Sequence, residues 1–77
     1  MKTIQYTRHA KNRMRMRNIS DVEITAAIGE PDFNESSVDG RVNVWKRSAD
    51  KFLRVTYKDV ADRIVIITAV KKKKGWR

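Results

Sequence analysis

The feature of this sequence that most limits the fold is a set of helix start and stop signals in its first third. The hydroxyl of Thr7 can accept hydrogen bonds from the amides of a first helical turn, and nothing from Arg8 to Arg17 interrupts a helix. Asn18 suits the left-handed conformation that often follows a last helical turn. The sequence therefore predicts a first helix over residues 8–17.

A second helix is predicted to follow almost at once. Ser20 and Glu23 have the spacing of a capping box, in which each residue satisfies a free backbone donor of the other. Apolar residues then recur at helical spacing as far as Ile28, and Gly29 and Pro31 are typical of a helix end. The second helix should therefore start near residue 21 and stop near residue 29.

The rest of the chain alternates between apolar and polar residues, which favours strands. The alternation predicts strands over residues 41–47, 52–58 and 64–70, with turns at 48–50 and 58–61. Phe33 could begin a further strand, and residues 4–6 are too few to assign. Because residues 64–70 are apolar on both faces, we expect a central strand that is covered on both sides.

These elements predict an α+β domain, with two N-terminal helices packed on one face of a three- to four-stranded antiparallel meander. With 77 residues there is room for one domain, which we place at residues 1–70, followed by a basic tail at 71–77. The expected core consists of Tyr6, Ala10, Met14, Ile24, Ala27, Ile28, Val42, Val44, Leu53, Val55, Ile64 and Ile66.

The charge of the chain is high and unevenly distributed. The net charge is +9, and residues 20–40 hold six acids and no base between two strongly basic segments. A basic field of this kind is typical of nucleic-acid binding, and also of binding to anionic membranes or to acidic proteins. The plainer alternative is the solvated surface of a small soluble protein.

One face of the predicted sheet carries residues that the hydrophobic core does not use. They mix rings with cations, a combination that stacks on bases and binds phosphates: Trp45, Arg47, Phe52, Arg54, Thr56 and Lys58. Trp45 either stacks on a base or covers a hydrophobic edge. We expect these residues to converge on one exposed patch, with His9 beside it.

Several classes of function have no support in the sequence. The chain contains no cysteine, no zinc-ligand spacing and no glycine-rich phosphate loop, so we expect neither a metal nor a cofactor. It has no apolar leader and no run long enough to span a bilayer, so we expect a soluble cytoplasmic protein without a membrane partner.

A family resemblance rests on a pattern that extends over nearly the whole chain. The pattern is His9-Ala10-x-x-Arg13-Met14-x-x-Arg17-x-Ile19-Ser20, then Pro31-Asp32, Gly40-Arg41 and Leu53-Arg54-Val55-x-Tyr57. It resembles a family of small bacterial domains of unknown function that is grouped with the RelE/ParE-like toxins and their BrnT-type relatives.

The resemblance implies a RelE-like fold and a toxin of a toxin-antitoxin system. Many members of the superfamily are messenger-RNA endoribonucleases that a cognate antitoxin neutralises, whereas ParE-like members act on a protein, gyrase. The partners implied are therefore RNA, free or ribosome-associated, and an antitoxin. The positions that match are His9, Arg13, Arg17, Arg54 and Tyr57.

A ribonuclease without a metal needs an acid, a base and cations around the phosphate. His9 is the only histidine, and it could transfer protons or tether its helix to a backbone carbonyl. Arg54 could grip a phosphate or be a solvent-facing cation. Tyr57 is the third catalytic candidate, although its strand position favours the core.

The predicted nucleic-acid-binding residues are Arg13, Arg17, Trp45, Lys46, Arg47, Lys58, Lys71, Lys72, Lys73 and Lys74. Arg13 shares a helix face with His9 and could instead pair with an acid of residues 20–40. The four lysines could attract RNA or an acidic antitoxin by counterion release, or form a frayed end. Three functions remain open: a metal-independent endoribonuclease, a non-catalytic nucleic-acid-binding module, and a toxin that binds a protein target.

Overall fold

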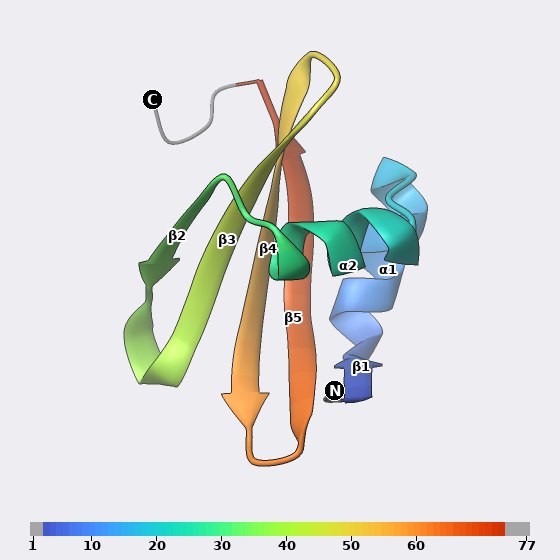
Figure 1. Ribbon diagram of the computed structural model, residues 1–77. Helices are drawn as coiled ribbons and strands as arrows, with labels where there is room; N and C mark the ends of the chain where they lie inside the picture. The colour runs from blue at the N-terminus through green and yellow to red at the C-terminus, as the bar shows by residue number, and fades with distance from the viewer. Residues whose placement is uncertain (1–2, 74–77) are drawn as a thin grey trace.

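A five-stranded sheet carries two helices on one of its faces (Figure 1). The structure is a computed structural model that describes residues 3–73. In chain order its elements are β1 (Thr3–Tyr6), α1 (Arg8–Arg17), α2 (Asp21–Gly29), β2 (Phe33–Ser36), a 3-10 turn (Val38–Gly40), β3 (Arg41–Ser48), β4 (Lys51–Val60) and β5 (Arg63–Lys72).

Both predicted helices are confirmed, together with the signals that delimit them. The Thr7 hydroxyl accepts a hydrogen bond of 3.0 Å from the amide of Ala10. Asn18 ends α1 in the left-handed region, at φ 55°. Ser20 and Glu23 form both bonds of the capping box at the start of α2.

The predicted α+β class is confirmed, but the sheet has five strands and is mixed, so the predicted three- to four-stranded antiparallel meander accounts only for β2 to β5. The strand order is β1-β5-β4-β3-β2, in which β2 to β5 pair antiparallel and β1 pairs parallel with β5. A parallel pair needs a long crossover between its strands. Here nearly the whole chain forms that crossover, and the four residues of β1 show no periodicity that would reveal their partner.

The two long hairpins turn through alanines with positive φ, at Ala49 (57°) and Ala61 (43°). Strands β4 and β5 have ten residues each and are longer than predicted. Lys71 and Lys72 pair with Leu53 and Phe52, because the backbone ladder continues past the last apolar residue. The first two lysines of the predicted tail therefore belong to the sheet.

The core lies between the sheet and the helices. Helix α1 packs on β5 and β1, and α2 packs on β4 and β3. The predicted core residues are buried or pack against the core, and Ile19 and Ala69 complete it. Strand β5 is covered by helices on one face only, which corrects the expectation of cover on both sides. No helix within residues 3–73 is long and apolar enough to cross a membrane.

Candidate nucleic-acid interface

We call the sheet surface that faces away from α1 and α2 the open face. The antiparallel register of β3 and β4 places residues on it in pairs, because side chains of a strand alternate between the two faces. These pairs are Arg41 with Lys58, Asn43 with Thr56, Trp45 with Arg54, and Arg47 with Phe52. The residues between them point to the helices, and Val44, Leu53 and Val55 among them are buried. The predicted grouping of rings and cations on one sheet face is confirmed.

The open face is strongly basic. Its strand residues include six cations, Arg41, Arg47, Arg54, Lys58, Arg63 and Lys72. Among the described strand residues of this face, Glu35 of β2 is the one acid, opposite Asn43. A surface of this charge attracts polyanions and releases their counterions.

Trp45 is the centre of the open face. Its residue is 7% exposed, and its indole N–H donates to Glu35 Oε1 at 3.4 Å. The guanidinium carbon of Arg54 lies 5.7 Å from the ring centroid, and the Lys72 ammonium lies 6.0 Å from it. The buried ring is therefore not a surface on which a base can stack. Instead it holds two cations in place through cation–π contacts.

Arg54 carries charge that no carboxylate of the described residues neutralises. Its Nε is buried and has no hydrogen-bond partner within residues 3–73. A buried donor without a partner costs free energy. With Lys72 on the same ring, Arg54 gives the open face a positive centre that an anion could satisfy.

His9 does not lie beside this centre. It is an exposed residue of α1, and its Nε2 accepts a hydrogen bond of 3.5 Å from Arg13 Nε. Arg54 lies between Leu53 and Val55, which face the helices, so its side chain points to the other side of the sheet. The expectation that the imidazole would border the basic patch is wrong.

The remaining helix residues and Tyr57 also lie on the helical side. Arg13 contacts His9 and forms no ion pair with an acid among the described residues. Arg17 is exposed at the end of α1. Tyr57 packs against the hydrophobic core. The structure therefore does not bring His9, Arg54 and Tyr57 together, and their catalytic roles stay predictions.

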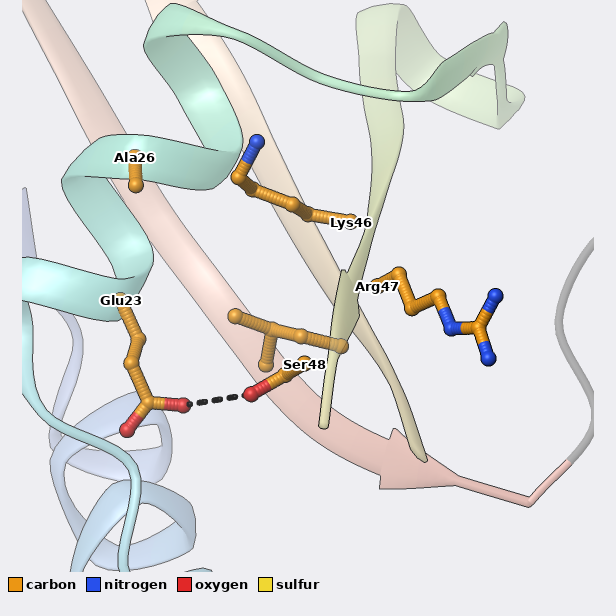
Figure 2. A pocket seen from close by; sticks show the side chains of 6 residues that line it. Glu23, Ala26, Lys46, Arg47 and Ser48 are labelled. Atoms are coloured by element: carbon orange, nitrogen blue, oxygen red, sulfur yellow. Dashed lines mark hydrogen bonds between the residues drawn. The ribbon is translucent and has the colours of Figure 1, made fainter. Parts of the chain in front are cut away.

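Two predicted nucleic-acid-binding lysines support the helical layer instead. Figure 2 shows Lys46 and Arg47 leaving β3 on opposite sides, with Lys46 directed towards α2. Lys46 Nζ donates to the backbone carbonyl of Glu30 at 2.9 Å, where α2 ends. Lys71 Nζ lies 3.2 Å from Glu23 Oε2. Cations at these positions neutralise the helix end and an acid rather than an external ligand.

Glu23 joins three elements on this side of the sheet. A cavity of about 100 Å³ lies beside it, lined by Glu23, Ala26, Lys46, Arg47, Ser48 and Leu53 (Figure 2). The Ser48 hydroxyl donates to Glu23 Oε2 at 3.5 Å. Burial acts to raise the pKa of Glu23, but hydrogen bonds from Lys71 and Ser20, with the charge of Lys71, hold that pKa below its usual value. These contacts give Glu23 a structural role, since its carboxylate connects α2 to β3 and β5.

The other predicted binding residues divide between the open face and the chain end. Arg47, Lys58 and Lys72 lie on the open face and are exposed. Lys73 is exposed directly after β5. Lys74 lies outside the described residues.

Three further open-face residues had not been predicted as binding residues. Arg41 and Asn43 share the alternation of Trp45, so the sequence held the signal for them. Arg63 begins β5 beside Thr3 of β1. It also pairs with Val60 of β4, just before the predicted start of this strand at residue 64.

Comparison with known proteins gives one family. A family model described as Domain of unknown function (DUF4258) matches residues 6–71, which is most of the chain. Neither the curated proteins nor the solved structures contain a match.

Proposed function

The chain belongs to the DUF4258 family of domains of unknown function, so the family assigns it no activity. From the surfaces of the protein itself, we propose that it binds single-stranded RNA through the open face. The observation that carries the proposal is the arrangement around Trp45. One ring holds Arg54 and Lys72 together, and neither cation has a carboxylate partner among the described residues. Two cations on one ring repel each other, and the Glu35 carboxylate that bonds the indole N–H forms an ion pair with neither of them. Phosphates of a nucleic-acid backbone would supply an anion to pair with them.

The form of the surface favours a single strand. Proteins read duplex DNA mainly with a helix or a two-stranded ribbon placed in a groove. A broad sheet face instead offers an extended strand several contacts in a row, as sheet-based binding modules do. Cations occur along the length of β4 and at both ends of β5, so the open face could follow a backbone over several nucleotides.

The wider setting of the proposal comes from the family resemblance. The resemblance to the RelE/ParE-like and BrnT-type toxins makes RNA, free or on the ribosome, the nucleic acid that we propose. It also makes a cognate antitoxin the proposed protein partner, and we propose the cytoplasm as the compartment. The six cations on one sheet face are compatible with either partner, since both would be acidic.

Matched lysines on the two sides of the molecule test the proposal. Lys58 lies on the open face and Lys11 on α1, and both are exposed. We expect Lys58→Gln to weaken binding of a labelled single-stranded RNA and to reduce the salt dependence of log K by about 0.7, the contribution of one phosphate contact. Lys11→Gln should change neither quantity. Equal effects of the two variants would refute the open face as the binding site, and wild-type binding that ignores salt would refute RNA binding itself.

A metal-independent endoribonuclease is the second candidate function. The observation in its favour is the exposed pair of His9 and Arg13, 3.5 Å apart, because an imidazole beside a guanidinium combines a proton acceptor with a phosphate ligand. Purified protein should then cleave RNA, and His9→Ala should abolish cleavage. Wild-type protein that leaves RNA intact, with and without ribosomes, would refute this candidate.

A further inference from the structure

Asn43 and Thr56 form a polar pair in the middle of the open face. They lie opposite each other on β3 and β4, and the Thr56 hydroxyl donates to Asn43 Oδ1 at 2.6 Å. A separation this short belongs to a bond between two oxygens rather than to one that involves an amide nitrogen. The oxygen of the amide is therefore the atom that faces Thr56.

The bond also fixes what Asn43 presents to a ligand. Thr56 is 8% exposed, so its hydroxyl lies below the surface and holds the amide from underneath. No described residue accepts a hydrogen bond from the amide nitrogen of Asn43. Within residues 3–73 the one buried side-chain donor without a partner is Arg54 Nε, so the Asn43 amide nitrogen reaches solvent. The side chain thus offers its N–H donors to solvent, while its oxygen is turned towards Thr56.

The position of the pair relates it to the cations. Along β4, Thr56 lies between Arg54 and Lys58, each two residues away, which is about 7 Å in an extended strand. Along β3, Asn43 lies in the same way between Arg41 and Trp45. A nucleotide whose backbone contacted Arg54 or Lys58 would therefore bring its base within reach of Asn43. The cations themselves cannot distinguish bases, because phosphates carry no sequence information.

We infer that Asn43, locked by Thr56, is a specificity-determining residue that selects bases with carbonyl oxygens. This inference rests on the proposed RNA binding. An amide that presents only donors needs an acceptor on the base. Uracil offers two exocyclic oxygens, and guanine and cytosine one each. Adenine accepts only at its ring nitrogens, and the paired contact that an asparagine makes with adenine also needs the amide oxygen to accept from the adenine amino group. In Asn43 that oxygen is turned to Thr56. The site therefore favours uracil over adenine.

Uracil and adenine make a discriminating comparison because stacking would favour adenine, whereas the hydrogen bonds of Asn43 would favour uracil. A purine offers a larger π-surface than a pyrimidine, so a surface that bound bases by stacking would favour oligoadenylate. Fluorescence anisotropy with labelled oligouridylate and oligoadenylate of about ten nucleotides measures the preference. We expect wild-type protein to bind the uridylate about threefold to tenfold more tightly, the value of one hydrogen bond.

Two variants and a control locate the preference. Asn43→Ala removes the donors, and Thr56→Val removes the hydroxyl that orients them while it keeps the shape of the side chain. Both should reduce the ratio of the two affinities to about one or below. Asn34→Ala, at an exposed position of β2 opposite Val44 on the other sheet face, should leave the ratio unchanged. Thermal unfolding of each variant shows that it folds.

The outcomes separate this inference from the proposed function. Binding of both oligonucleotides with equal affinity, or a uridylate preference that survives Asn43→Ala, would refute the role of Asn43 and leave RNA binding intact. Failure of wild-type protein to bind any oligonucleotide would refute both. A uridylate preference that disappears in Asn43→Ala and Thr56→Val but not in Asn34→Ala supports the inference.

Discussion

The carboxylate of Glu23 and the ammonium of Lys71 form an ion pair of 3.2 Å. It joins the first turn of α2 to the C-terminal end of β5. The same carboxylate accepts from the backbone and the hydroxyl of Ser20, at 3.3 Å each. One side chain thus caps a helix and fastens it to the sheet.

We expect Glu23→Gln to reduce the free energy of unfolding by about 1 to 2 kcal/mol, because it weakens a helix cap and removes a partly buried ion pair. Urea denaturation at neutral pH measures the change. Glu30→Gln is the control, since its side chain is exposed at the far end of α2. Equal losses of unfolding free energy in the two variants would show that the ion pair does not stabilise the protein.

Glu23 should also make stability depend on pH in the acid range. Its pKa in the folded protein lies below the usual 4.5, so the unfolded chain binds this proton more readily than the folded protein. The stabilisation is therefore complete above the unfolded pKa and is lost as the pH falls through the folded pKa. The difference in stability between wild type and Glu23→Gln should shrink when denaturation is repeated below pH about 4. A difference that stays constant would contradict this assignment.

Glu35→Gln should strengthen RNA binding by about threefold, because it removes the acid of the open-face strands while glutamine still offers an oxygen to the Trp45 indole. Anisotropy titration at two salt concentrations measures the effect. Asp50→Asn, in the turn after β3, is a matched control that should leave the affinity unchanged. Weaker binding in Glu35→Gln would mean that Glu35 contacts the ligand itself.

Asn18→Ala should destabilise the protein by about 1 kcal/mol, since alanine pays the steric cost of φ 55° without the local hydrogen bonding of asparagine. Asn18→Gly should remain close to wild type, because glycine adopts this conformation without strain. Thermal unfolding compares the two, and a domain of this size should lose about 4 to 8 °C per kcal/mol. A larger loss for glycine than for alanine would contradict this explanation.

His9→Ala should leave RNA affinity unchanged, because His9 lies on α1, across the sheet from the open face. Anisotropy with the same RNA measures this, and Lys72→Gln is the positive control that should weaken binding. Lower affinity in His9→Ala, in a variant that unfolds at the wild-type temperature, would show that the ligand also reaches the helical side.

The sequence predicted those parts of the molecule that depend on neighbouring residues. Helix ends are set by local capping, so Thr7, Asn18 and the pair of Ser20 and Glu23 could be assigned correctly. Alternation likewise placed Trp45 and Arg54 on a common face. The pairing of β1 with β5 depends instead on residues about sixty positions apart, and four residues do not carry enough pattern to show it.

The candidate site was predicted less well, for a related reason. The sequence identifies the basic residues, but it does not show to which side of the sheet each side chain points until the strands and helices are placed in three dimensions. Lys46 and Lys71 lie on the helical side because side chains of a strand alternate between the two faces. There Lys46 binds the backbone carbonyl of Glu30, and Lys71 pairs with the Glu23 carboxylate. Similarly, helical spacing shows which residues share a face with His9, but it does not show on which side of the sheet the helix packs.

The parallel pairing of β1 with β5 also governs the order in which the chain can fold. Among the described elements, β1 and α1 are made before the others during synthesis, but the surface on which both rest is mainly β5, which is made after the others. Until residues 63–72 have emerged from the ribosome, the N-terminal segment has no place to dock. Closure of the domain must therefore wait for a contact across nearly the full chain, which is entropically costly and slow. A nascent chain that stalls in β5 would expose the apolar side of α1 to chaperones and proteases.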